Sequence, residues 1–342
     1  MLLEMLSNAA GVSGAEGPVR DIVLEAIRGK VDETRIDSLG NLIAVKRAAD
    51  AKGSGARVMV AAHMDEVGVM IVHIESSGFL RFRPVGGIDP RVLLSKQVLI
   101  GEKAVPGVIG QKAIHLLKPS DRGHVVPVEQ MFIDIGAKDR AEAESLVKLG
   151  DCAVFATRFA SLGGTAKGKA LDDRAGCAIL AELLADGPYP CEIVGVFTVQ
   201  EEVGLRGAQV AAYAVEPDFA LVLEGTVCDD SPKKVDVSPT TRLGAGPAIS
   251  IADRSAIADR RLVDLVVATA KAIGSPYQFK QPMIGGTDAG RIHLSRGGVP
   301  TVVLAVPCRY LHSPVSLLSL SDYDHTLKLA KATLARIDEV GK

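Results

Sequence analysis

The sequence contains no long apolar run, no tract of like charges and no closely spaced pair of cysteines. A membrane-spanning helix needs about 18 consecutive apolar residues, and no stretch approaches that length. The 39 basic and 41 acidic residues are interspersed, so there is no basic run for a nucleic-acid partner. The start, MLLEMLSNAAGVSG, has Glu4 but no basic residues before its apolar residues, unlike a secretory signal. These absences predict a cytoplasmic protein that binds neither membrane nor nucleic acid.

The five cysteines are an odd number and lie far apart, at Cys152, Cys177, Cys191, Cys228 and Cys308. Such a set gives neither a disulfide framework nor the spacing of a thiolate metal site. We therefore expect reduced thiols that pack as small apolar side chains.

The length and the composition indicate a soluble globular protein with more than one domain. A chain of 342 residues exceeds the size at which a single hydrophobic core usually stops growing. Hydrophobic residues make up 47% and charged residues 23% of the chain, which is the balance of an ordinary folded protein.

Helical and strand patterns alternate over most of the chain. Apolar spacing predicts two helices joined by a loop within residues 2–27, and strands within 34–46 and 56–74. Further along, we predict helices over 172–186, 257–274 and 321–340, strands over 191–200 and 299–307, and a loop followed by a strand over 211–225. This alternation predicts an α/β fold with a mixed, mainly parallel sheet flanked by helices.

Residues 72–164 differ from the rest of the chain. Short runs typical of strands, such as FLRFRPV, QVLIGE and PGVIG, alternate there with Gly, Pro and Asp. This pattern predicts a small inserted β domain of barrel-like form. The predicted division is thus one domain over 1–71 and 165–342, interrupted by a β domain over 72–164.

Polar side chains that could carry chemistry follow several of the predicted strands. They are His63 with Asp65, the pair Glu201 and Glu202, Glu224, and His312. Ligands of open α/β sheets bind beyond the carboxyl ends of the strands, where these residues are expected. Each one alone could be a solvated group at the sheet edge. Their convergence in one domain is what favours a functional site.

A pair of aspartates, Asp172 and Asp173, stands at the predicted start of a helix. Aspartate is favoured at helix N-termini, because it accepts hydrogen bonds from free backbone N–H groups and complements the helix dipole. One member of the pair can therefore cap the helix while the other faces a cation.

The donors at these positions are His63, His312, Glu224, one aspartate of the pair Asp172 and Asp173, and one glutamate of the pair Glu201 and Glu202. They offer carboxylate oxygens and imidazole nitrogens but no thiolate. Such a set suits zinc, cobalt or manganese. Five ligands are too many for a single zinc ion with an open position, but they suit two ions if one aspartate bridges them.

At this point the motifs AHMDEVG, ALDDRAG, QEEVGLRGA, LEGT, GGTDAG and RYLHSP, in this order, resemble those of a known family. The sequence resembles the M42 family of dinuclear metallo-aminopeptidases, which includes glutamyl aminopeptidases and tetrahedral, dodecameric aminopeptidases. The resemblance extends over essentially the whole chain. It differs in LDDR, where the family often has LDNR, and in Glu224, where many members have aspartate.

The resemblance implies a role for each motif residue. It implies two divalent ions that share one ligand. His63, Glu224 and Asp172 would hold one ion, and Glu202, His312 and Asp172 would hold the other. It also implies that Glu201 is the general base and that Asp65 is a supporting catalytic carboxylate. The implied fold is a zinc-peptidase-like α/β domain with an inserted β domain used for dimerisation, and the implied substrates are short peptides. The segment IGGTDAGRIH would lie near the pocket for the first side chain of the substrate.

Two other functions remain open from the sequence. A glycoside hydrolase also uses paired carboxylates, but it needs no metal and leaves both histidines unexplained. In a non-catalytic assembly protein, the polar residues at the strand ends would no longer have a catalytic role. The sequence also leaves open which metal is bound and whether the assembly is a dimer or a homododecamer. It does not settle which N-terminal residue is preferred; Arg254 and Arg309 are candidate contacts for an acidic one. The other histidines are expected at the surface or in packing.

Overall fold

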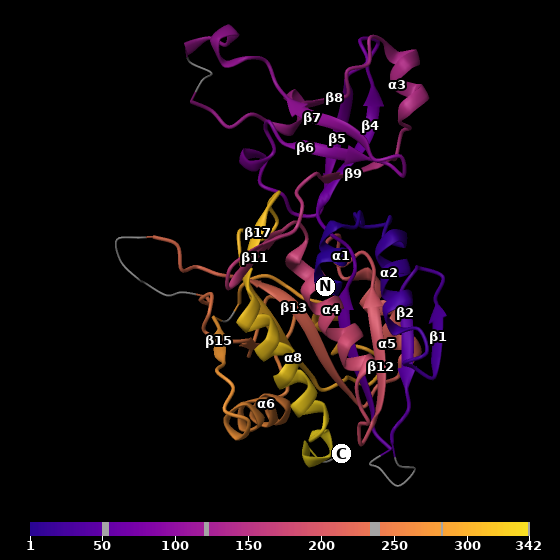
Figure 1. Ribbon diagram of the computed structural model, residues 1–342, viewed down its shortest axis with the longest axis vertical. Coiled ribbons are helices and arrows are strands. Elements are labelled where there is room, and N and C mark those ends of the chain that lie inside the picture. Colours follow the sequence, from indigo (N-terminus) through magenta and orange to yellow (C-terminus); the bar gives the residue numbers. More distant parts are fainter. Residues whose placement is uncertain (50–54, 120–122, 233–239, 282, 341–342) are drawn as a thin grey trace.

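The computed structural model describes residues 1–342 except 50–54, 120–122, 233–239, 282 and 341–342. Figure 1 shows a large sheet with its helices in the lower part of the molecule and a smaller β structure above it. No helix in the described ranges has the length and apolar character that a membrane span requires.

The centre of the large sheet consists of four parallel strands. Their order is β12 (Glu192–Thr198), β3 (Arg57–His63), β13 (Phe219–Val227) and β16 (Thr301–Arg309). Parallel neighbours place their carboxyl ends at one edge, so residues after these strands come close together. His63, for example, lies directly beside Thr198.

Antiparallel strands extend the sheet on both sides. Beyond β12 lie β2 (Leu42–Lys46) and β1 (Glu33–Ile36), and beyond β16 lie β17 (Ser316–Ser319), β11 (Thr165–Gly168) and β10 (Ala160–Leu162). In addition, β14 (Ala248–Ser250) pairs antiparallel with β16 and parallel with β15 (Gln278–Lys280). The mixed sheet with a parallel centre confirms the predicted fold class.

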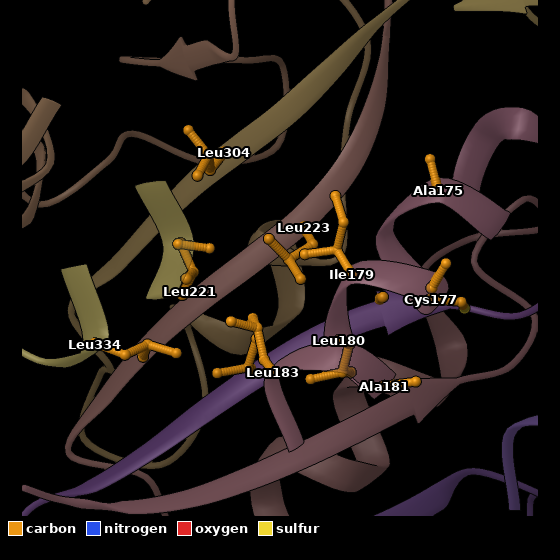
Figure 2. Close-up of a cluster of buried hydrophobic side chains, with 14 of the residues drawn as sticks. Ala175, Cys177, Ile179, Leu180, Ala181, Leu183, Leu221, Leu223, Leu304 and Leu334 are labelled. Carbon is orange, nitrogen blue, oxygen red and sulfur yellow. The ribbon is translucent and has the colours of Figure 1, made fainter. Parts of the chain in front are cut away.

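Helices bury both faces of the sheet. One face packs against α1 (Leu2–Asn8), α2 (Gly17–Ile27), α4 (Leu171–Ala185), α6 (Arg260–Ala272) and α8 (Leu320–Leu334); the other packs against α5 (Arg206–Val215) and α7 (Ala289–Ile292). Side chains along a strand alternate between faces. Thus Leu221 and Leu223 meet α4, as Figure 2 shows, whereas Val222 faces the second layer.

The inserted structure is a closed antiparallel barrel in the order β4-β5-β8-β7-β6-β9. Its strands are β4 (Gly68–Ile74), β5 (Leu80–Val85), β6 (Gln97–Ile100), β7 (Val105–Gly110), β8 (Phe132–Asp134) and β9 (Cys152–Phe155). The segment also contains α3 (Arg140–Leu146) and 3-10 turns at Pro90–Val92, Ile114–Leu116 and Val128–Gln130; another follows α8 at Ile337–Val340. The barrel has its own apolar core. The predicted barrel-like insertion is therefore present, while the domain boundaries at 72 and 164 stay a prediction.

Three predicted elements differ in detail. Residues 56–74 form two strands rather than one, because the chain leaves the sheet after His63 and enters the barrel at Gly68. Residues 211–215 are the end of α5 rather than a loop. Glu224 lies inside β13 rather than after it, because β13 continues its pairing with β16 up to Val227.

Candidate metal centre

His63 is the last residue of β3 and is buried. Its Nδ1 lies 3.1 Å from the backbone oxygen of Asp65 and 3.5 Å from the Asp65 carboxylate. Such an outer contact fixes the tautomer and directs the other ring nitrogen, Nε2, toward a ligand. The carbonyl of Asp65 is therefore the nearer partner of the ring, and its carboxylate lies slightly farther away.

The Asp65 carboxylate instead holds the turn that follows β12. Its Oδ1 accepts a hydrogen bond from the Glu201 backbone N–H at 2.9 Å, and its Oδ2 accepts one from the Glu202 N–H at 3.1 Å. The Ser13 hydroxyl also donates to Oδ2, at 2.6 Å. Asp65 thereby fixes the backbone that carries both glutamates.

The two aspartates before α4 have different surroundings. Asp173 accepts hydrogen bonds from the backbone N–H of Gly176 at 2.9 Å and of His63 at 3.3 Å. It therefore acts as the cap of α4, because both aspartates have non-helical dihedrals and regular helix begins after them. The peptide bond between them is cis. The Asp172 side chain is left free to face the two histidines.

His312 approaches from the loop after β16. Its Nδ1 lies 3.0 Å from the backbone oxygen of Gly87, a residue between β5 and the turn at Pro90–Val92. The inserted segment thus orients a side chain of the large sheet. This contact directs Nε2 of His312 toward Asp172 and Glu202.

Asp172 lies between the two imidazoles. Its Oδ1 is 3.4 Å from Nε2 of His63, and its Oδ2 is 3.5 Å from Nε2 of His312. Glu224 Oε2 lies 3.6 Å from the same nitrogen of His63, and Glu202 Oε1 lies 3.3 Å from that of His312. The structure therefore brings all five predicted ligands together, as two sets that share Asp172.

The ligand atoms of Asp172, Glu202 and His312 all lie within 4.8 Å of one another, as one metal site requires. The same holds for His63 with Asp173 and Glu224, and for His63 with Glu201 and Glu202. The second and third groupings add Asp173 and Glu201, which the sequence did not count as ligands. Asp173 is already engaged as the cap of α4.

The electrostatics of the cluster favour positive charge. Burial lowers the pKa of His312, but contacts with the Asp172 and Glu202 carboxylates outweigh burial and raise this pKa to about 11. Burial likewise opposes protonation of His63, yet Asp172 and Asp65 raise its pKa well above the usual range. Burial raises the pKa of Glu224 well above that of a free carboxyl. Buried carboxylates outnumber the two imidazoles, and buried charges are normally paired or bound to metal.

Two oxygens in this cluster have no hydrogen-bond partner, namely Asp172 Oδ1 and Glu224 Oε1. Both are buried, and buried polar atoms seldom stay unpaired in native proteins. Both belong to side chains that face Nε2 of His63. A cation among these atoms would satisfy them, so the residues present fit a divalent metal of the kind that carboxylates and imidazoles bind.

The family model of M42 glutamyl aminopeptidase matches residues 40–329 of this sequence. The chain belongs to the M42 family. Membership makes the protein an aminopeptidase, and it agrees with the resemblance of the six motifs.

Solved structures agree over the whole length of the M42 chain. A TET aminopeptidase from the marine sediment archaeon Thaumarchaeota archaeon SCGC AB-539-E09 has a TM-score of 0.94 and 39% identity, over 99% of this chain and 96% of its own. The TET1 peptidase of Pyrococcus horikoshii, which can assemble into a tetrahedron or a large octahedral shell, has a TM-score of 0.86 and 36% identity, covering 98% and 99%. An endoglucanase of Thermotoga maritima has a TM-score of 0.82 and 37% identity, covering 99% and 98%.

A cavity of about 340 Å³ opens beside the cluster in this M42 protein. It is lined by His63, Asp172, Glu201, Glu224 and His312, and by the loop 284–287 that the sequence placed near the substrate pocket. The cluster is thus reachable from a space large enough for an amino-acid side chain.

Several backbone positions around the cluster are strained. Ala170, Gln200, Tyr310 and His312 have φ between 50° and 61°, in the left-handed region that residues other than glycine rarely adopt. Each lies on a segment that carries a predicted ligand. Strain of this kind costs on the order of 1–3 kcal/mol per residue and is concentrated at functional sites.

Two buried polar groups near the M42 cluster were not predicted from the sequence. Asp288, at the start of α7, accepts a hydrogen bond from Thr198 Oγ1 at 2.5 Å, and burial raises its pKa to about 6. Glu66 accepts from Lys169 Nζ at 2.6 Å and from Arg174 at 3.0 Å. GGTDAG and HMDEVG contain the two acids, but no spacing rule distinguishes a buried acid from a solvated one.

Other predicted residues have structural surroundings. The Arg309 guanidinium is paired with Asp230 at 2.7 and 2.8 Å, and the exposed Arg254 is not among the residues that line the cavity. The five cysteines are free, as predicted, and none lines the cavity. Of the remaining histidines, His73, His115 and His124 are exposed, and His293 and His325 are partly buried.

Proposed function

We propose that this M42 aminopeptidase holds two divalent metal ions and removes the first residue of short peptides, with Glu201 as the general base. The supporting observation is the position of Asp172 between the two histidines, with its Oδ1 and the Glu224 Oε1 lacking partners. His63, Asp172 and Glu224 would hold one ion. Asp172, Glu202 and His312 would hold the other. Zinc suits these ligands best, and cobalt or manganese would also fit.

Two cations at this place would polarise the peptide carbonyl and lower the pKa of a water molecule toward neutrality. The remaining step, proton transfer, is assigned to a side chain of the protein. Glu201 lines the cavity beside His63, and its backbone is fixed by Asp65. Burial raises the pKa of its carboxyl well above the usual range, which makes the carboxylate a stronger base. In this mechanism Glu201 accepts a proton from the attacking water and returns it to the leaving amine.

The test of this assignment is Glu201→Gln, which keeps the shape of the side chain and removes its basicity. General acid–base catalysis contributes typically about 10²–10⁴-fold, so kcat should fall by at least about 100-fold. Elemental analysis should still find both metal ions. A kcat close to the unmodified value would remove Glu201 from this role.

Chelation separates this proposal from a glycoside hydrolase. Peptide hydrolysis should stop when the protein is stripped by a chelator and return when zinc, cobalt or manganese is added. A glycosidase needs two carboxyl groups and no metal. Hydrolysis of a β-glucan that survives the chelator would favour the endoglucanase alternative.

We also propose that the barrel mediates self-association into dimers and from there into a homododecamer. Large apolar side chains are exposed on this segment at Val72, Val108, Ile114, Leu116, Val125, Leu146 and Leu149. Exposed apolar side chains gathered on one segment support an interaction site there. The assembly of the Pyrococcus horikoshii relative into closed shells supports the larger state.

The mass of the purified protein in solution, measured by light scattering, tests the assembly. We expect twelve subunits for the unmodified chain and smaller species for Leu116→Glu with Leu149→Glu. The control is Ile257→Glu, because Ile257 is an exposed apolar residue of the large domain. A monomer at micromolar concentration would contradict the proposal.

A further inference from the structure

The turn after β12, residues 199–202, carries the proposed general base, and side chains from other segments hold its backbone. Each of its four N–H groups donates a hydrogen bond to such a side chain. Asn41 Oδ1 accepts from the first at 3.0 Å, Glu16 Oε1 from the second at 3.1 Å, and the Asp65 carboxylate from the third and fourth. The acceptors lie between 136 and 184 residues away in sequence. The position of the turn therefore depends on the fold around it.

Glu16 stands directly before α2, at the position whose side chain often caps a helix. Within the described ranges, its carboxylate accepts no hydrogen bond from the first turn of α2. Its Oε1 instead accepts from the Gly14 N–H at 2.7 Å and from the Gln200 N–H at 3.1 Å. The residue is only 5% exposed. Because a buried carboxylate is stable only when it is hydrogen-bonded, these contacts account for its burial.

Gln200, which receives this support, has an unfavourable backbone conformation. Its φ is +56°, in the left-handed region that residues with a Cβ atom rarely adopt. Such a conformation persists only where the surrounding structure holds it. The hydrogen bond to Glu16 is one of these restraints. Rotation of Gln200 to an ordinary φ would redirect the chain at the next residue, Glu201.

The loop that carries Glu16 is itself fixed to the chain that leaves β3. The Gly11 carbonyl accepts from the Glu66 N–H at 2.9 Å, and the Gly11 N–H donates to the Glu66 carboxylate at 3.2 Å. The Ser13 hydroxyl donates to Asp65 at 2.6 Å. Glu16 is thus attached to a rigid support on one side and to the catalytic turn on the other.

We propose that Glu16 is a positioning residue of the active site, which holds the turn 199–202 so that Glu201 stays within reach of the attacking water. This inference rests on the proposed function, because it requires Glu201 as the general base. Of the described residues that line the cavity, none belongs to the segment 11–17, so Glu16 acts through the backbone and not on the substrate. A misplacement of about 1 Å in an active site can cost about 100-fold in rate.

Three replacements separate the reach of the Glu16 side chain from its charge. Glu16→Gln removes the charge and keeps an acceptor oxygen at the same distance from the backbone. Glu16→Asp keeps the charge and a favoured helix cap, but its side chain is shorter by one methylene group. Glu16→Met keeps the length and removes both oxygens. We expect Glu16→Gln to retain most of kcat, whereas Glu16→Asp and Glu16→Met should lower kcat at least about tenfold with KM close to the unmodified value.

The variants are loaded with zinc, cobalt or manganese and assayed with the aminoacyl p-nitroanilide that the unmodified enzyme hydrolyses fastest. Elemental analysis of the same samples gives kcat per occupied site. The control is Asn8→Leu, because Asn8 Oδ1 accepts a hydrogen bond from the Phe159 N–H at 2.9 Å, away from the turn. This control also loses an acceptor for a backbone N–H group, and it should keep its kcat.

A double-mutant cycle with Glu201→Gln tests whether Glu16 acts through the base. Replacements of residues that work as one unit have effects that are far from additive. In the Glu201→Gln background, Glu16→Met should therefore lower kcat little further. A general loss of folding would instead multiply the two effects.

Three results would overturn the inference while leaving the proposed function intact. The first is an unchanged kcat in Glu16→Asp and Glu16→Met. The second is a loss in Glu16→Gln as large as that in Glu16→Met. The third is a double variant in which the two losses multiply. If Glu201→Gln keeps its kcat, the proposed function fails at its general base, and this inference fails with it.

Discussion

The replacement Asp65→Asn tests whether one buried carboxylate positions the catalytic turn. Its two oxygens each accept a backbone hydrogen bond, from Glu201 at 2.9 Å and from Glu202 at 3.1 Å. An asparagine offers one oxygen and one NH₂ group, so either orientation leaves one of these N–H groups without an acceptor. The Ser13 hydroxyl can rotate and accept from the new amide.

A buried N–H without an acceptor costs about 1–3 kcal/mol. For a chain of this length, that cost lowers the melting temperature by only about 1–4 °C. The loss of activity should be larger, because Glu201 and Glu202 would no longer be held in place. Loss of such a supporting contact typically costs about 10–100-fold in metal affinity or activity. We therefore expect kcat/KM to fall by at least about tenfold in a protein that remains folded.

Thermal unfolding, elemental analysis and kcat/KM measured on the same samples check this prediction. The control is Asp322→Asn. Asp322 accepts backbone hydrogen bonds from Gly244 at 2.6 Å and Gly246 at 2.8 Å, and it takes no part in the metal cluster. This control should lose similar stability and keep its activity. Full activity in Asp65→Asn, or an equal loss in both variants, would refute the positioning role.

Three further changes have defined outcomes. Gly225→Ala would place a Cβ 2.9 Å from the Cβ of Asp172 and 3.0 Å from its Cα, so we expect loss of bound metal by elemental analysis and at least about a tenfold loss of activity. Burial lowers the pKa of Lys169 from 10.5 in the unfolded chain to about 8 in the folded protein. Between these two pH values the unfolded chain binds more protons than the folded protein. Lys169 therefore makes the free energy of unfolding rise with pH over this range, by up to about 3 kcal/mol. Urea unfolding at pH 7.5 and 10 should show that rise and its loss in Lys169→Met. Arg309→Ala breaks the partly exposed pair with Asp230 and should change the free energy of unfolding, measured with urea, by about 1 kcal/mol or less.

Sequence patterns were informative where a short segment alone fixes the structure. The parallel centre of the sheet followed from apolar strands such as β3 and β13, because strands buried on both faces read as continuous apolar runs. The change in composition after residue 71 indicated the inserted barrel. Four of the five predicted ligands were recognisable because each stands at or near the end of a strand, whereas Asp172 stands at the start of α4.

Local patterns failed where a neighbour in space decides the outcome. Residue type and position before a helix do not by themselves distinguish Asp172 from Asp173, yet the fold makes Asp173 the cap of α4 and turns Asp172 toward the histidines. Asp288 gave no signal, because burial rather than spacing makes it unusual.

The sequence by itself determined the family and the fold class and predicted the donor set, since periodicity and residue type are properties of the chain. Only the tertiary structure decided how the donors meet. His312 is oriented by the backbone of Gly87, 225 residues away in sequence, and Asp65 holds a turn 136 residues away. Such contacts depend on how the barrel and the sheet pack, and no local stretch of sequence encodes that packing.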